Sequence, residues 1–256
     1  MSQEKIMKNG GDTNQGEGGV AWLSSSDAAA FRQNDGLFRT QEVQEEKYGK
    51  AYYSDAHVAY KEKGYSLEER REKYADALRN ISTTLEGNIL DIGCGPGHFV
   101  AILRNEPFSR EVFGIDYSAS ATQTLSTTEA RPYIVQGSAT HLPYADNSFE
   151  SAYSFHTLEH LTEDQLEDAI AEISRVVTSQ LYLIIPTWGE AILSKRELFN
   201  QIVDDPTHRV LATRSWWLKQ FEKYGWKADE VQAESFDRLG RGWVFVLERN
   251  NSPVSP

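Results

Sequence analysis

The sequence has few of the features that would place a protein in a membrane, in an oxidising compartment or on nucleic acid. Only one cysteine, Cys94, occurs among 256 residues, which excludes an intramolecular disulfide and a zinc site built from several cysteines. Lysine and arginine (26) are outnumbered by aspartate and glutamate (38), and the net charge of −12 opposes nucleic-acid binding. No apolar run approaches the roughly 20 residues of a membrane span. The N-terminus lacks the apolar core of a signal peptide. A soluble, cytoplasmic protein is expected, with no signal for its oligomeric state.

Composition divides the chain into four parts. Residues 1–36 are rich in glycine, serine, asparagine and glutamine, and are predicted to be a disordered tail. Residues 37–86 contain clustered tyrosines and a helix start with capping-box spacing at "SLEE", which predicts an N-terminal helical cap or lid. Residues 87–250 are predicted to form the main domain, followed by a short tail at 251–256.

Strand-like runs alternate with helical segments in the main domain. The predicted strands are 88–92, 111–116, 132–136, 149–155 and 180–185, and the predicted helices are 97–105, 118–127, 162–177 and 213–224. The chain closes with "WKADEVQAESF", a "DRLGRG" turn and "WVFVLER", which predicts an antiparallel hairpin. This order predicts an α/β fold with a mostly parallel sheet and helices on both faces.

The stretch "NILDIGCGPGHFV" contains a glycine-rich turn between the first strand and a helix. Such a turn is where open α/β sheets bind ligands. The pattern of a mononucleotide loop is absent, and His98 stands at the third glycine of a dinucleotide loop. A nucleoside carrying an amino acid remains, because Asp91 before the turn suits an ammonium group and poorly suits a phosphate. Asp116 ends the second strand, 19 residues after Gly97. This spacing matches that of the acidic residue that accepts hydrogen bonds from the ribose hydroxyls in nucleotide-binding folds.

Four motifs, "ILDIGCGPG", "VFGIDYS", "GSATHLPYADNSFE" and "FHTLEHL", occur in this order at suitable spacings. Together they resemble class I S-adenosylmethionine-dependent methyltransferases over about residues 50–249. The resemblance implies a Rossmann-like seven-stranded sheet with an antiparallel last strand, a methyltransferase domain at 87–250, and S-adenosyl-L-methionine as cofactor. The cofactor-binding residues that it implies are Asp91, Gly93, Cys94, Gly95, Gly97, Asp116, Tyr117, Ser138, Ala139 and Phe155.

The resemblance also implies what several of these residues bind. The backbone of the glycines would lie alongside the methionine moiety, Asp116 would hold the ribose, and Tyr117 would cover one face of the adenine. Ser138 departs from the family, which usually has aspartate there to read the adenine edge. A hydroxyl bonds an amino group less strongly than a carboxylate does, so lower cofactor affinity is expected.

Two further segments, "DDPTHRVLATRSWWLKQFEKYGW" and "YGKAYYSDAHVAY", give a narrower resemblance. They are similar to methyltransferases of types 11 and 12 that are associated with glycans and glycosyltransferases. This likeness implies a sugar or a saccharide-like small molecule as acceptor. Trp216 and Trp217 lie at helical positions, and at least one of them is expected in the core.

A hydroxyl acceptor benefits from a general base, which is usually histidine. His156 follows the fourth strand, His160 lies four residues further on, and His208 lies in the "DPTHR" loop. Each has a structural alternative: His160 precedes a capped helix, and His156 could line the pocket or fix its loop. His208 is favoured as a base because little packing is expected there. Glu159 is expected to bond backbone or cofactor-side groups.

The pair Asp204 and Asp205, with His208, could also be read as ligands of a divalent ion. Adjacent aspartates before a proline are more typical of a solvated turn, so no metal is expected.

The sequence therefore predicts an S-adenosylmethionine-dependent methyltransferase that O-methylates a sugar or saccharide-like acceptor. The fourth strand ends in "SFHT" rather than in the turn that grips a flipped base, which disfavours nucleic-acid methylation. The glutamate-rich loop that would bind a substrate arginine is also absent, which disfavours methylation of protein arginine side chains. The alternatives are a methyltransferase for small-molecule natural products and a non-catalytic S-adenosylmethionine-binding protein.

Overall fold

The computed structural model describes residues 37–39, 68, 71–72, 75–105, 111–188, 207–237 and 242–250. The predicted tails, the tyrosine-rich segment, the capping box at "SLEE" and the two adjacent aspartates before Pro206 lie outside the described residues. Within the described residues, no helix has the length and apolar character needed to cross a bilayer.

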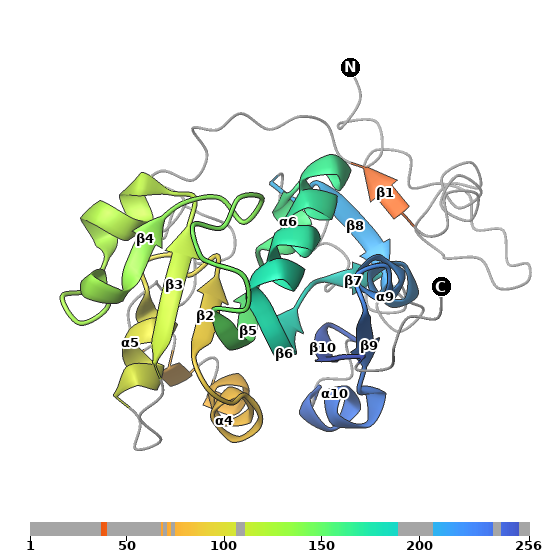
Figure 1. The fold of residues 1–256 in the computed structure, drawn as a ribbon, viewed down its shortest axis with the longest axis horizontal. Coiled ribbons are helices and arrows are strands. Elements are labelled where there is room, and N and C mark those ends of the chain that lie inside the picture. The colour runs from red at the N-terminus through yellow and green to blue at the C-terminus, as the bar shows by residue number, and fades with distance from the viewer. Residues whose placement is uncertain are drawn as a thin grey trace, which may run out of the picture.

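A seven-stranded sheet forms the centre of the molecule (Figure 1). The first five strands are mutually parallel, whereas the last strand of the chain, β10, is antiparallel to both of its neighbours. This is the predicted Rossmann-like arrangement. In order across the sheet, the strands are β4 (Ile134–Gln136), β3 (Val112–Asp116), β2 (Ile89–Ile92), β5 (Phe149–Phe155), β6 (Val177–Ile184), β10 (Val244–Arg249) and β9 (Trp226–Ala228).

Helices cover both faces of this sheet, as predicted, and each face has its own apolar core. One face carries α6 (Glu163–Val176) and α9 (Arg214–Glu222), and the other carries α4 (Ala75–Thr84), α5 (His98–Arg104) and α10 (Glu230–Phe236) (Figure 1). Trp216 and Trp217 are both buried in the first core. Burial of such large side chains removes enough apolar surface from water to hold the helices against the strands.

Helix α6 shows why the sequence pattern was informative. The Thr162 side chain accepts a hydrogen bond from the Gln165 N–H, and the Gln165 side chain accepts one from the Thr162 N–H. This capping box satisfies two of the N–H groups that a helix start leaves unpaired. Leu166, Ile170 and Ile173 then form a fully buried stripe facing the sheet.

Two predicted elements differ from the structure. The segment at 118–127 is a short π-helix, Ser120–Leu125, rather than an α-helix. The predicted hairpin is interrupted, because "EVQAESF" forms α10 instead of continuing the strand. The Asp229 side chain accepts a hydrogen bond from the Gln232 N–H and caps this helix. The strands on either side, β9 and β10, do pair antiparallel.

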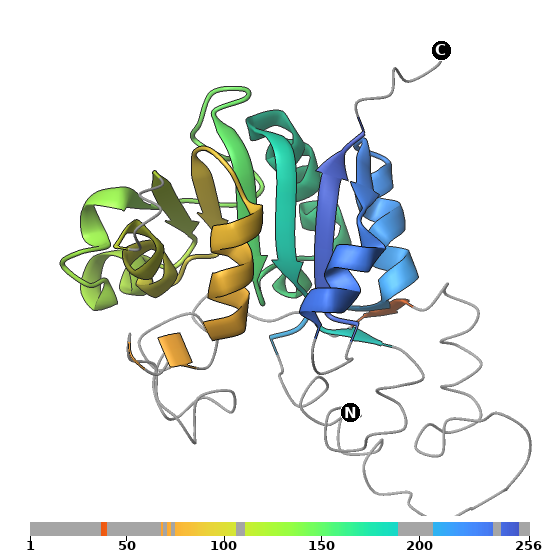
Figure 2. The ribbon, with the colours of Figure 1, turned by 90° about the horizontal axis from the view of Figure 1, so that it is seen from below.

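A second, small sheet was not predicted. It contains β1 (Leu37–Arg39), β8 (Val210–Thr213) and β7 (Thr187–Trp188). Because β7 follows β6 after two residues, this sheet lies beyond the carboxyl ends of the main strands (Figure 2). It thereby brings the segment before β8 to the edge where α/β sheets bind ligands.

Candidate functional site

The glycine-rich turn after β2 is a backbone cradle. Gly93, Gly95 and Gly97 all have positive φ angles, of 79°, 54° and 81°. The N–H groups of Gly93 and Cys94 both donate to the carbonyl oxygen of Ile115 in β3, at 2.8 and 3.0 Å. The turn is therefore fixed to the neighbouring strand.

Glycine is required in this turn for space as well as for conformation. A Cβ atom at Gly93 would lie 2.0 Å from Oγ1 of Thr157, and one at Gly97 would lie 2.6 Å from Cβ of Ala130. The backbone of the turn is thus packed directly against the end of β5 and the segment before β4. Cys94 is buried between its neighbours, where burial raises the pKa of its thiol well above the usual range.

Asp91, near the end of β2, is a buried acid. Only 2% of its surface is exposed, and the Tyr153 hydroxyl donates to its Oδ2 atom at 3.0 Å. Burial raises the pKa of Asp91 well above its usual range; the Tyr153 hydrogen bond opposes the rise, and nearby Asp116 adds to it. A cationic group beside this carboxyl would remove the cost of ionising it.

Asp116 lies at the end of β3, next to the glycine turn. Its Oδ2 accepts a hydrogen bond from the Gly95 N–H and its Oδ1 accepts one from the Ser118 N–H, both at 2.8 Å. Each carboxylate oxygen has a second lone pair with which it can accept from a ligand hydroxyl. Tyr117 follows directly and is 51% exposed.

The remaining predicted cofactor residues lie around these two acids. The Gly137 N–H donates to the carbonyl oxygen of Asp116, which brings the following Ser138 and Ala139 to the end of β3. The Ser138 hydroxyl oxygen accepts from the Thr140 N–H at 3.2 Å, so this side chain also holds its own turn. Phe155 ends β5 and packs edge-on against Phe99 of α5.

A second group of polar side chains lies at the carboxyl end of β5. His156 has a φ angle of 52°, and its N–H donates to the carbonyl oxygen of Ile184 at 2.9 Å. Its Nδ1 lies 3.3 Å from Oε1 of Glu159, which belongs to the short 3₁₀ turn Leu158–His160. One third of the His156 side chain is exposed, whereas Glu159 is fully buried.

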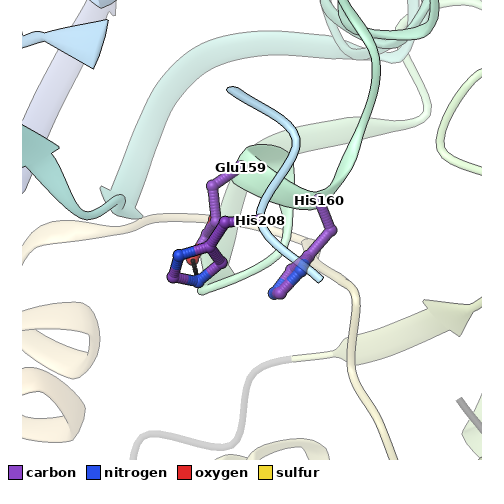
Figure 3. A group of neighbouring side chains, drawn as sticks. All are labelled: Glu159, His160 and His208. Carbon is purple, nitrogen blue, oxygen red and sulfur yellow. Dashed lines mark ion pairs between the residues drawn. The ribbon is translucent and has the colours of Figure 1, made fainter. Parts of the chain in front are cut away.

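His208 and His160 complete this group (Figure 3). Nε2 of His208 lies 4.0 Å from Oε1 of Glu159, and the rings of His160 and His208 are 5.0 Å apart. Two contacts join their segments: the Arg209 N–H donates to the Glu159 carbonyl at 2.7 Å, and Oγ1 of Thr207 lies 2.9 Å from Nδ1 of His160. All three histidines named from the sequence thus surround one carboxylate.

Of the two kinds of contact expected for Glu159, with backbone or with cofactor-side groups, the structure tests only the first. Neither carboxylate oxygen makes a hydrogen bond of good geometry with any described residue, so it does not bond backbone there. Burial alone would raise the pKa of Glu159, but His156, His160 and His208 outweigh burial and lower it. The position of Glu159 next to His160 in "LEHL" was visible in the sequence. Its place at the centre of three histidines required the fold.

Comparisons with known proteins agree with this geometry. Residues 90–185 match the methyltransferase domain family. A malonyl-[acyl-carrier protein] O-methyltransferase from Methylococcus capsulatus is 29% identical over 62% of this chain and 58% of its own length. The uncharacterised methyltransferase YcgJ from Bacillus subtilis is 25% identical, covering 69% of this chain and 70% of that protein.

Comparison with a solved structure supports the fold. An S-adenosylmethionine-dependent methyltransferase from Thermotoga maritima superimposes with a TM-score of 0.51 at 19% identity, covering 70% of this chain and 90% of that one. The chain carries a methyltransferase domain with a Rossmann-like fold. It spans about three fifths of the length of the Methylococcus relative.

The residues of this methyltransferase domain fit the chemical groups of S-adenosylmethionine. The buried carboxyl of Asp91 matches the cofactor's ammonium group, and Asp116 matches the ribose hydroxyls. The cradle at Gly93, which a Cβ would fill, lets a ligand approach the backbone closely. Tyr153 and Thr157, which pack against Asp91 and Gly93, were not identified from the sequence; the alternation of "SAYSF" along β5 was the only signal for Tyr153.

Proposed function

We propose that this protein transfers a methyl group from S-adenosylmethionine to a hydroxyl oxygen of a small acceptor, a sugar or a saccharide-like molecule. The observation that carries the proposal is His156, whose side chain is one third exposed and held beside the buried Glu159 at the carboxyl end of β5. His208, favoured as the base from the sequence because little packing was expected there, is instead buried, at 6% exposure. This end of the strand lies next to the glycine turn, because Thr157 contacts Gly93. The acceptor would therefore meet the cofactor in front of His156.

The bound cofactor would supply an electrophilic methyl group on a sulfonium. Asp91 and Asp116 hold and orient its two ends, and the rest of catalysis is alignment of the acceptor oxygen with the methyl carbon. His156 accepts the hydroxyl proton as the new C–O bond forms, and the electron pair of the broken C–S bond stays on sulfur. Glu159 stabilises the imidazolium that results, since its carboxylate lies 3.3 Å from the ring.

The histidines favour a hydroxyl over a carboxylate acceptor. The Methylococcus relative is named as an O-methyltransferase of a malonyl group. A carboxylate is already an anionic nucleophile and needs no base, whereas a hydroxyl must lose a proton. A base placed at the rim of the site is therefore best explained by a hydroxyl. The saccharide class rests on the likeness of "DDPTHRVLATRSWWLKQFEKYGW" to glycan-associated methyltransferases.

The test is release of S-adenosylhomocysteine from S-adenosylmethionine with nucleotide sugars, free and lipid-linked saccharides, small phenols, amines and carboxylic acids. We expect turnover with a hydroxylated saccharide and a loss of about 100-fold or more in His156→Ala. Cofactor binding should be unchanged in that variant. His141→Ala serves as a matched control, because His141 is exposed and lies outside the cluster.

The other outcomes identify the alternatives. Turnover only with phenols would point to a natural product, and turnover only with carboxylic acids would overturn the assignment of a base. Binding of S-adenosylhomocysteine without turnover on any acceptor would indicate a non-catalytic cofactor-binding protein.

A further inference from the structure

The cluster around Glu159 has a feature that a general base does not need. Glu159, His160 and His208 each offer one ligand atom, and these three atoms all lie within 4.8 Å of one another. Figure 3 shows the three side chains extending from two separate segments toward one region. A single base requires one histidine and one carboxylate, so two further imidazoles gathered at the same place call for another explanation.

The buried carboxylate of Glu159 has histidines beside it but makes no hydrogen bond of good geometry with the described residues. Glu159 is 0% exposed, and neither of its oxygens has a hydrogen-bond partner among the described residues. The neighbouring nitrogens, Nδ1 of His156 and Nε2 of His208, lie at 3.3 and 4.0 Å. Burying a carboxylate costs free energy unless positive charge lies beside it, and an imidazole supplies that charge only when it is protonated. A cation bound between the three side chains would offset that cost.

The surroundings hold the candidate ligands in place. The Thr207 hydroxyl lies 2.9 Å from Nδ1 of His160 and fixes the orientation of the ring, as outer contacts do for metal-bound histidines. The backbone bond from Arg209 to Glu159 fixes the two segments to each other at 2.7 Å. Ligand atoms at about 2.1 Å from a tetrahedral ion are about 3.4 Å apart, so small side-chain rotations would bring the present atoms to coordination distance.

We propose that Glu159, His160 and His208 bind a divalent first-row transition-metal ion of the zinc type, with an open position facing the acceptor site. Two imidazoles and one carboxylate suit such an ion, whereas magnesium and calcium prefer oxygen ligands alone. The open position would take the acceptor hydroxyl and lower its pKa, leaving His156 to receive the proton. This role rests on the proposed function; the binding of the ion does not.

These ligands differ from the set read in the sequence. Asp204 and Asp205 lie outside the described residues, and only His208 is shared with that reading. The expectation that no metal is used was based on those two aspartates. Glu159 and His160 do not belong to that predicted ligand set.

The probe is Co²⁺, whose visible absorption reports coordination by protein nitrogen and oxygen without any methyl transfer. The full chain is stripped with a chelator and titrated with Co²⁺, and Zn²⁺ stoichiometry is measured separately by elemental analysis. We expect one ion per chain, competition between the two metals, and a rise in melting temperature on metal binding. Glu159→Gln and His208→Ala should each weaken Co²⁺ binding by at least about 100-fold, since each removes a direct ligand. His141→Ala should bind as tightly as the unchanged protein.

Folding is checked by binding of S-adenosylhomocysteine, which does not involve these ligands. Co²⁺ affinity that is equal in the unchanged protein and Glu159→Gln would overturn the metal site, as would the absence of a visible band. Should both ligand variants unfold, Co²⁺ that fails to raise the melting temperature of the unchanged protein would overturn it too. Methyl transfer by a fully chelated protein that binds no Co²⁺ would refute this site alone. Co²⁺ binding without methyl transfer on any acceptor would refute the proposed function alone.

Discussion

Asp91 and Glu159, the two carboxyl groups that are buried among the described residues, have nearly the same exposure but opposite pKa shifts. They are 2% and 0% exposed. Burial raises the pKa of Asp91 well above its usual range, whereas the pKa of Glu159 is lowered although burial acts against it. The difference lies in their neighbours, which are a phenol and another acid for Asp91 and three histidines for Glu159.

The contrast separates the site into two halves, a cofactor half around Asp91 and a histidine half around Glu159. Among the described residues, none supplies a cation to Asp91, and in the proposed function the ammonium group of the cofactor takes that place. Glu159 is already surrounded by imidazoles and acts on them rather than on the cofactor. In the proposed function, Asp91 therefore binds the cofactor, whereas Glu159 supports the proton transfer.

The largest effect is expected for Glu159→Gln, which keeps the shape of the side chain and removes its charge. His156 would lose the carboxylate that stabilises its protonated form, so the methyl-transfer rate should fall by about 100-fold to 1,000-fold. The dissociation constant of S-adenosylhomocysteine should change by less than about threefold, well under 1.4 kcal/mol. Single-turnover transfer and equilibrium binding measure the two quantities. A comparable loss of cofactor affinity would show that the two carboxyls do not act separately.

A somewhat smaller effect is expected for Asp91→Asn. Loss of a charged partner for the cofactor's ammonium group should weaken S-adenosylhomocysteine binding by about 10-fold to 100-fold. Calorimetry measures this affinity. The matched ligand is 5′-methylthioadenosine, which has the nucleoside and the thioether but no amino acid. It should bind the variant and the unchanged protein equally, and a loss of its affinity too would indicate a general disruption of the turn.

The cofactor half could be predicted from the sequence because its signals are local. "ILDIGCGPG" and "VFGID" each specify a strand and the turn after it, and the structure places both turns side by side. The helix α10 was missed because "EVQAESF" alternates like a strand, although the capping spacing of Asp229 and Gln232 was present. The π-helix at Ser120–Leu125 has no comparable signal.

The histidine half could be predicted only in part. His156 and His160 follow one strand in the sequence, so their proximity was foreseeable. His208 joins them through β8 and the backbone bond between Arg209 and Glu159. These are contacts between segments about 50 residues apart, and no local periodicity encodes them. Glu159 acquires its role from those contacts.

The glycine turn can be tested by comparing two glycines that have the same φ angle of 79°, Gly93 and Gly225. Alanine at either position costs about 1–2 kcal/mol of strain. At Gly93 the new Cβ would also lie 2.7 Å from Cβ of Thr157, a contact that side-chain rotation cannot relieve, whereas at Gly225 its nearest neighbour is 3.6 Å away. Denaturant unfolding should show a loss of about 2–3 kcal/mol for Gly93→Ala and about 1 kcal/mol for Gly225→Ala. Equal losses would mean that the turn is not packed against Thr157.

The smallest effect is a gain in stability in Asp91→Asn without ligand. The folded-state pKa of Asp91 is raised, so the folded protein is favoured at low pH and its stability declines as the pH rises from the unfolded value toward the folded one. Asparagine does not titrate. The gain in the free energy of unfolding of the variant should therefore be absent near pH 4 and amount to about 1 kcal/mol or more at pH 8. Melting temperatures at the two pH values measure it. A variant that is less stable at pH 8 would contradict the assignment of Asp91 as a buried acid without a cation.

The most direct test of this division of work is a crystal structure with bound S-adenosylhomocysteine. The account predicts that the amino group of the ligand contacts Asp91, that its ribose hydroxyls contact Asp116, and that its sulfur faces the side of the pocket that contains His156. A ligand whose sulfur points away from His156, or whose amino group lies far from Asp91, would contradict it.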